Sequence, residues 1–227
     1  MKTIKVLSTL FALMLLPLAA NAVPNLQLDC DPCTYDAVAE DTVAESSTFD
    51  VVAILTEGNN NKIDVDANNF WVSIALTGEY TETEAEAIFD ALLIDGVAAS
   101  SLGTLVFGTP YGGDGDLAEH GIFETWYIEF QLDVADGFAC DTYDVQTQEG
   151  YATAGSGSWC IEFAVDRSSV PTTATLHFDL YSVVDDEIER FAPFSHDVTS
   201  VPEPGTLSLL GLGLLALGLG RRRREIA

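Results

Sequence analysis

Alternation of apolar and polar residues, repeated in separate segments, is the feature that most restricts the fold of this chain. Apolar residues stand at every second position in residues 70–76, 126–134, 159–165 and 176–181. A shorter apolar segment covers residues 51–55. A two-residue period puts alternate side chains on opposite faces of a strand. Each alternating segment is therefore predicted to be a β-strand with one buried face.

Turn-forming clusters rich in Gly, Asn, Asp and Ser separate the predicted strands. The clearest lie at residues 58–61, 111–116, 136–137 and 155–158. Strands that each bury one face need a second sheet to cover that face. The 12 Phe, 7 Tyr and 3 Trp residues can fill one such core. The sequence therefore predicts an all-β domain, an antiparallel two-sheet sandwich of jelly-roll-like form.

One segment gives two alternative predictions. Residues 81–93 are rich in Ala, Glu and Leu, and Thr81 with Glu84 fits a capping box, which favours a helix. The Asp95-Gly96 dipeptide favours a hairpin within residues 88–101 instead. Neither alternative changes the fold class, because a single helix can lie across a sandwich.

The net charge of −27 excludes some classes of partner. Acidic residues number 36 against 9 basic ones, although 48% of the chain is hydrophobic. A strongly negative surface repels phosphate backbones and anionic lipid headgroups, so nucleic-acid binding is not expected. Between residues 23 and 202 only Lys62, Arg167 and Arg190 are basic. The negative charge therefore belongs to the central part of the chain.

Residues 1–22 have the pattern of a secretory signal peptide. Two lysines precede an apolar stretch at residues 6–18, and Ala20-Asn21-Ala22 is an A-x-A site for signal peptidase. Residues 23–200 are then the exported acidic domain. An uncleaved anchor is the alternative, but the apolar stretch is shorter than the ~20 residues that span a bilayer.

Residues 201–227 contain three parts in a fixed order. A Pro-Glu-Pro box is followed by a small and apolar run at residues 206–220 and then by four arginines. The box is Pro202, Glu203 and Pro204, and the arginines are Arg221, Arg222, Arg223 and Arg224. Prolines end a preceding strand, the apolar run can form a membrane helix, and arginines hold its far end in the cytoplasm. A helix of about 22 Å suits a temporary anchor in a ~30 Å hydrocarbon core.

This order of box, apolar helix and arginines resembles the PEP-CTERM sorting signal of Gram-negative bacteria. In proteins with that signal, an exosortase removes the tail and passes the protein to the cell surface or the extracellular matrix. The resemblance therefore implies signal peptidase and exosortase as partners during export, with a transient stay in the inner membrane. A membrane anchor that is never cut is the alternative.

The central domain carries a second resemblance, in separate segments. Four segments are similar to parts of the secreted bacterial family called choice-of-anchor N. They are LQLDCDPCTYD, GTPYGGDGDLAEHGIFETWY, LHFDLY and FAPFSHD. Members of that family share a body and differ in their C-terminal anchor. The resemblance spans residues 26–200 and implies an exported location without a particular activity. The cysteines are additional to the usual pattern of that family.

Four cysteines in an exported chain predict disulfide bonds. Cys140 and Cys160 lie near the ends of two predicted strands, with a glycine-rich insertion between them. Cys30 and Cys33 are separated by two residues and could close a small ring. Four cysteines allow three disulfide connectivities, and the one that pairs Cys30 with Cys33 and Cys140 with Cys160 is favoured. A zinc site is not favoured, because it needs a second close pair.

Two acidic turns are candidates for calcium, the one cofactor that comes into consideration. Asp114 and Asp116 alternate with glycines, and two carboxylates with backbone carbonyls can share a hard cation. Residues 64–68 have oxygen-bearing side chains at alternate positions but lack the glycine and glutamate of an EF-hand. The alternative, which the sequence favours, is that both stretches are solvated turns.

Catalytic motifs are weak throughout the sequence. Glu124 and Glu129 are five residues apart on one predicted strand, so their side chains point to opposite faces and cannot act as a glycosidase pair. His120, His177 and His196 have no nucleophile motif beside them. The chain is therefore predicted not to be an enzyme.

Two non-enzymatic functions remain. A structural or adhesive protein of the exopolysaccharide or biofilm fits the export signal, the sorting tail and the acidic surface. A carbohydrate-binding, lectin-like module is the alternative, with Trp71, Tyr127 and Tyr181 on polar strand faces as its candidate platform. A glycoside hydrolase is the least favoured function.

Overall fold

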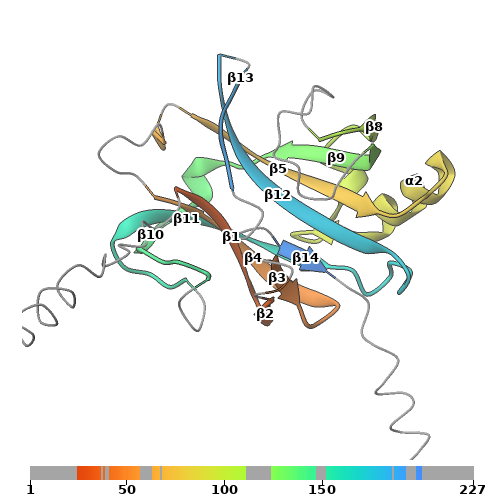
Figure 1. Ribbon diagram of the computed structural model, residues 1–227, viewed down its shortest axis with the longest axis horizontal. Helices are drawn as coiled ribbons and strands as arrows, with labels where there is room; N and C mark the ends of the chain where they lie inside the picture. The colour runs from red at the N-terminus through yellow and green to blue at the C-terminus, as the bar shows by residue number, and fades with distance from the viewer. Residues whose placement is uncertain are drawn as a thin grey trace, which may run out of the picture.

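A computed structural model describes residues 25–36, 38, 41–56, 63–66, 68–110, 124–146, 152–185, 187–192 and 198–200. Within these residues the chain is mostly β-structure, arranged in two sheets with one short α-helix (Figure 1). The predicted signal peptide and the predicted C-terminal membrane helix lie outside the described residues. Among the described residues, no helix is long and apolar enough to cross a membrane.

The first sheet has six strands, all paired antiparallel. Its order is β1 (Leu26–Asp31), β4 (Thr48–Leu55), β11 (Gly157–Asp166), β6 (Leu93–Ile94) and β7 (Val97–Ala98). β10 (Phe138–Asp141) pairs with the beginning of β11. The long strands β4 and β11 therefore form the centre of this sheet.

The second sheet has eight strands and is built around β5 and β12. Its order is β2 (Cys33–Asp36), β3 (Asp41–Ala44), β14 (Val198–Ser200), β12 (Thr175–Val184), β5 (Asn69–Thr77), β9 (Thr125–Gln131) and β8 (Val106–Gly108). β13 (Glu187–Phe191) pairs with β12 beyond the end of β14. The pairing of β14 with β3 is parallel, unlike the other pairings and unlike the predicted antiparallel arrangement.

One hydrophobic core lies between the sheets and contains the predicted apolar faces. It includes alternate residues of β4, β5, β9, β11 and β12, among them Val51, Ile74, Ile128, Phe163 and Phe178. Two edge-to-face aromatic pairs join the sheets, with centroids 6.1 Å apart for Phe49–Phe178 and 5.7 Å apart for Phe130–Phe163. The sheets therefore pack face to face, as the sequence predicts for a sandwich.

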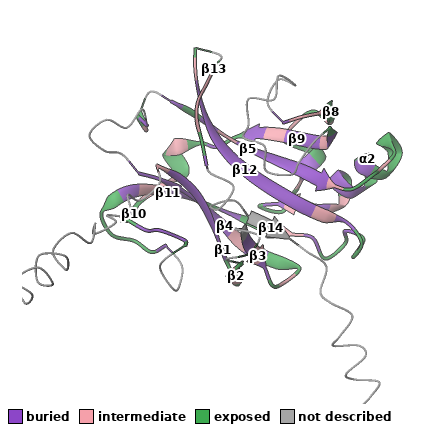
Figure 2. Cartoon of the chain, viewed as in Figure 1, coloured by how far each residue is buried: buried purple, intermediate pink, exposed green. Residues whose placement is uncertain are grey.

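The central strands of the second sheet are buried on both faces. Ser73 and Ala75 of β5 and His177 and Asp179 of β12 belong to the predicted polar faces, yet all four are buried. Figure 2 shows β5 and β12 buried along most of their length. Alternation therefore identified the core-facing side of these strands but not the burial of the opposite side.

Both alternatives for residues 81–101 occur, one after the other. The helix α2 (Glu82–Ala91) begins with the predicted capping box, in which the backbone N of Thr81 donates to Glu84 Oε2 over 2.8 Å. It ends at Leu92, whose backbone is extended. The strands β6 and β7 then form a hairpin with a two-residue turn at Asp95 and Gly96. This turn needs positive φ angles, which are 49° at Asp95 and 77° at Gly96.

Two short 3-10 helices complete the described structure. η1 (Ala99–Ser101) follows the hairpin, and η2 (Val134–Asp136) follows β9. The predicted strand at residues 126–134 is therefore too long, because β9 ends at Gln131. Asp133 ends it by accepting a 2.9 Å hydrogen bond from the backbone N of Ala135, which starts the 3-10 turn.

Removal of the Thr81 side chain tests whether the capping box stabilises α2. Thr81→Ala should lower the free energy of unfolding by about 1 kcal/mol, because the first turn of α2 loses its side-chain acceptor. Thr81→Ser should retain the cap. Urea unfolding measures the difference, with the exposed Thr104→Ala as control. Equal effects of Thr81→Ala and Thr104→Ala would contradict a stabilising cap.

Candidate functional sites

The sorting-signal residues and the favoured calcium turn both lie outside the described residues. Pro202 to Pro204, Arg221 to Arg224, Asp114 and Asp116 all fall in that group. The second acidic stretch forms a local turn, in which Asp64 Oδ1 accepts from the backbone N of Asp66 at 3.0 Å. The backbone carbonyl of Asp64 accepts a second hydrogen bond, from the backbone N of Asn68 at 2.8 Å.

Three acidic residues lie near one another on the outer face of the first sheet. Asp31, Asp50 and Asp166 line a hollow of about 370 Å³, and Asp31 is the direct cross-strand partner of Asp50. Within the described part of the chain, no group of three His, Cys, Asp or Glu side chains is placed to hold a metal ion. Asp31 is exposed, and Asp50 and Asp166 are half-buried, so these three carboxylates form an acidic patch on the surface of this sheet.

The disulfide between Cys140 and Cys160 joins β10 to β11. This is the favoured pairing, and both cysteines are fully buried, with Cα atoms 5.8 Å apart. They belong to a small second core on the outer face of the first sheet. Its other members are Val52, Ile54, Tyr143, Val145 and Ala152.

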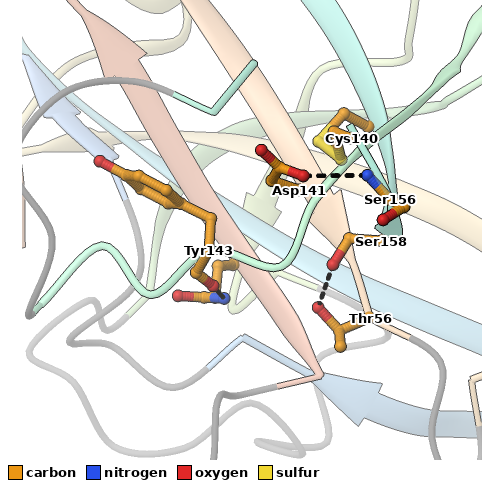
Figure 3. The surroundings of a disulfide bond; sticks show 8 residues. Thr56, Cys140, Asp141, Tyr143, Ser156 and Ser158 are labelled. Carbon is orange, nitrogen blue, oxygen red and sulfur yellow. Dashed lines mark hydrogen bonds between the residues drawn. A yellow bond between two sulfur atoms is a disulfide. The ribbon is translucent and has the colours of Figure 1, made fainter. Parts of the chain in front are cut away.

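Hydrogen bonds also hold the chain between these two cysteines against the sheet. Gln27 of β1 is buried, and its side chain donates to the Tyr143 carbonyl at 2.7 Å and accepts from the Val145 N at 3.1 Å. Around the disulfide in Figure 3, Asp141 accepts from the Ser156 N at 3.0 Å. The disulfide therefore anchors a covering segment that has its own apolar and polar contacts.

The other disulfide joins Cys30 to Cys33, again as favoured. Cys30 is the fifth residue of β1 and Cys33 the first of β2, and these strands belong to different sheets. The short ring thus lies where the chain crosses from one sheet to the other. Cys30 is buried in the main core, and Cys33 packs against that core.

Asp29 is a buried carboxyl group on the same face as the covering segment. Burial raises the pKa of Asp29 to about 6, and repulsion from Asp31 adds to the rise. A 2.8 Å hydrogen bond from the Cys30 N to Asp29 Oδ1 acts in the opposite direction but is the weaker effect. The pKa of Tyr143 is also raised, by burial and by the nearby Asp29 charge.

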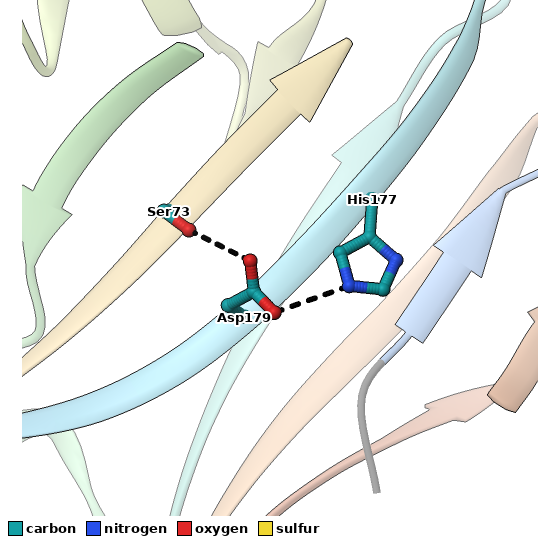
Figure 4. A network of polar contacts seen from close by, with 3 residues as sticks. All are labelled: Ser73, His177 and Asp179. Atoms are coloured by element: carbon teal, nitrogen blue, oxygen red, sulfur yellow. Dashed lines mark hydrogen bonds and ion pairs between the residues drawn. The ribbon is translucent and has the colours of Figure 1, made fainter. Parts of the chain in front are cut away.

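A buried polar network links β5 and β12 on the outer face of the second sheet (Figure 4). Asp179 Oδ2 accepts from Ser73 Oγ at 3.2 Å, and Asp179 Oδ1 lies 3.1 Å from His177 Nε2. The carboxylate stands between the serine and the histidine. A serine nucleophile requires the histidine in the middle, where it can take the hydroxyl proton. This geometry therefore supports a structural network and not an activated Ser73.

The candidate carbohydrate platform is less accessible than its strand positions predict. Trp71, Tyr127 and Tyr181 lie on one face of the second sheet, with Trp71 directly opposite Tyr181. Tyr181 is 0% exposed and Tyr127 is 4% exposed, whereas Trp71 is half-buried. Tyr181 Oη donates to Glu129 Oε1 over 2.8 Å. A sugar could therefore reach Trp71 but not the two tyrosine rings.

The structure contains a larger cleft that sequence analysis missed. It has a volume of about 910 Å³ and is lined by Leu55, Val65, Asp66, Val134, Ala135, Gly157, Ser158 and Trp159. Alternation assigns Trp159 to the core face. Its position as the first apolar residue after the turn at 155–158 is the signal that it lies at the open end of the core.

The described domain therefore defines a class of protein: β-rich, strongly acidic and stabilised by two disulfides. Comparison with known families adds the function of its tail, because residues 200–224 match the PEP-CTERM protein-sorting motif. A motif of this kind marks an exported protein that is processed by an exosortase. No curated protein and no solved structure matches the chain. The resemblance of residues 26–200 to the choice-of-anchor N family is not supported by any match.

The two disulfides should differ in their contribution to stability. Replacing Cys140 and Cys160 by alanine should lower the free energy of unfolding by ~3 kcal/mol, because the bond closes a loop of about 20 residues in the unfolded chain. Replacing Cys30 and Cys33 should cost ~2 kcal/mol, because that ring is short. Denaturant unfolding of both double variants measures the difference. A larger loss for the Cys30/Cys33 variant would contradict the loop-length explanation.

The raised pKa of Asp29 predicts a pH-dependent stability difference. The folded state holds the carboxyl proton more tightly than the unfolded chain, so this contribution is full below about pH 4 and is lost as the pH rises through about 6. Asp29→Asn imitates the protonated group. It should be more stable than the wild type by about 3 kcal/mol at pH 7, with little advantage near pH 4.

Thermal unfolding from pH 4 to pH 7 measures this difference. Glu162→Gln removes a charge from an exposed side chain on the same face as Asp29, on the far side of Val52 of β4, and serves as control. An Asp29→Asn advantage that does not depend on pH, or one that Glu162→Gln matches, would show that general charge repulsion is responsible.

Proposed function

We propose that this chain is a non-catalytic protein of the cell surface or extracellular matrix of a Gram-negative bacterium, with a structural or adhesive role in exopolysaccharide or biofilm. The observation that carries the proposal is the PEP-CTERM match at residues 200–224, directly after the acidic β-rich domain. In the proposed sequence of events, signal peptidase cuts near residue 22, the C-terminal apolar run holds the chain in the inner membrane, and exosortase then removes the tail.

Three properties of the domain support this role. Two disulfides suit an oxidising compartment outside the cytoplasm. The high negative charge keeps the exported domain soluble and prevents non-specific binding to other acidic polymers. Ser73 and Glu129 both take part in hydrogen bonds that hold strands together, which suits a rigid sandwich of jelly-roll-like form.

Processing of the chain tests the proposal. Mass spectrometry of the protein from the cell surface and matrix should find a chain that begins near Val23 and ends near the Pro-Glu-Pro box. A strain without exosortase should retain the full tail in its membrane fraction. Replacing Pro202 and Pro204 by alanine should have the same effect in the wild-type strain, whereas Thr206→Ala, outside the box, should not. Full-length protein with Arg221 to Arg224 on the outer surface would overturn the proposal.

A further inference from the structure

The cleft around Trp159 lies where the space between the sheets opens at one end. Trp159 begins the apolar face of β11, Leu55 ends β4, and the two are direct cross-strand partners. Val134 of η2 and Val65 of the 64–66 turn close two further sides. At about 910 Å³ the cleft falls in the range of small-molecule sites in proteins, which is about 300–1,000 Å³.

The indole ring of Trp159 is held in a fixed orientation. Its Nε1 donates to the Val134 carbonyl at 3.1 Å. Gly137 allows this approach, because a Cβ at that position would lie 2.1 Å from Trp159 Nε1. The ring is half-buried, packs against the main core and lines the cleft. A ring positioned in this way loses little conformational entropy when a ligand binds to it.

The cleft also has polar groups, a buried hydroxyl pair and an exposed carboxylate. Ser158 Oγ lies 2.9 Å from Thr56 Oγ1, so the two hydroxyls form a buried pair (Figure 3). Asp66 is exposed, and its backbone is held by the 3.0 Å hydrogen bond to Asp64 Oδ1. The cleft therefore combines a flat aromatic surface with a carboxylate that can accept hydrogen bonds from ligand hydroxyls.

We propose that this cleft binds a neutral saccharide, with the apolar face of a sugar ring on Trp159 and a sugar hydroxyl on Asp66. A lipid chain would remove the Asp66 carboxylate from water without giving it a partner, which is unfavourable. An acidic sugar would face both Asp66 and the strongly negative domain. A neutral sugar has the hydroxyl donors and the apolar ring face that fit both groups.

This inference rests on the proposed function and names the class of matrix component that the domain recognises. It also places the sugar site at Trp159 and not at the Trp71 face, where two of the three rings are buried. The two locations can be separated by substitution, because Trp71 does not line the cleft.

Calorimetric titration of the full chain in lipid nanodiscs tests the site. The probes are the hexasaccharides of cellulose, laminarin, amylose, xylan and mannan, with hexaguluronate as the acidic probe. At least one neutral hexasaccharide should bind, and hexaguluronate should not. Trp159→Phe should weaken binding by about tenfold, and Asp66→Ala by about fivefold, because each removes one favourable contact.

Two variants serve as matched controls. Trp126 is also half-buried, packs against the main core and donates from Nε1 to a carbonyl, that of Tyr80 at 3.0 Å, but it does not line the cleft. Trp126→Phe should therefore leave the affinity unchanged. Glu162→Ala removes an exposed carboxylate elsewhere on the first sheet and should also have no effect. If Trp159→Phe fails to fold, the exposed Asp66→Ala variant still decides the question.

The outcomes distinguish this inference from the proposed function. Absence of binding by every neutral probe, equal binding of hexaguluronate, or equal weakening by Trp126→Phe or by Trp71→Phe would each overturn the Trp159 site. Mass spectrometry of the same strains reports export and tail removal independently. A chain that is processed but binds no sugar refutes only the cleft, whereas a chain that is never processed refutes the proposed function.

Discussion

Burial of the apolar faces of β4, β11, β5 and β12 against one another is the interaction on which the rest of the structure depends. These strands are long, and their inner side chains form a single core with the Phe49–Phe178 and Phe130–Phe163 pairs across it. The shorter strands pair with them or extend their sheets. The acidic side chains lie outside this core, and the buried Asp29 and Asp179 are on the outer faces of the two sheets.

The outer faces of the two sheets are covered in different ways. On the first sheet, the segment that includes Tyr143 and Val145 adds a small apolar cluster, fixed by the Cys140–Cys160 bond. On the second sheet, buried polar groups satisfy one another, as Ser73, Asp179 and His177 do. A disulfide thus holds the covering segment on the first sheet, whereas a hydrogen-bond network lies on the outer face of the second sheet.

Sequence patterns predicted the parts of the fold that are determined by residues close together in the sequence. Alternation found the strands around Ile74, Ile128 and Phe178, and the capping box and the Asp95-Gly96 turn were both visible in the residues. The burial of Ser73 and His177 was not predictable, because polar residues that pair inside a protein look the same in sequence as polar residues in water. The Trp159 cleft was missed for a related reason, since alternation gives the face of a strand but not its distance from the end of the core. The tail was recognised from its order alone, and the family match at residues 200–224 supports that assignment.

The position of β14 has a mechanical consequence. This strand ends at Ser200, two residues before the Pro-Glu-Pro box, and it pairs with β12 on one side and with β3 on the other. Hydrogen bonds on both edges of β14 must therefore break before tension at this exit can detach the strand. β3 continues this load path, because it pairs with β2, where Cys33 is bonded to Cys30 of β1 in the other sheet. Tension applied where the tail leaves the domain can therefore pass through β3 and β2 to the first sheet, where the Cys30–Cys33 disulfide reinforces the backbone connection between β2 and β1.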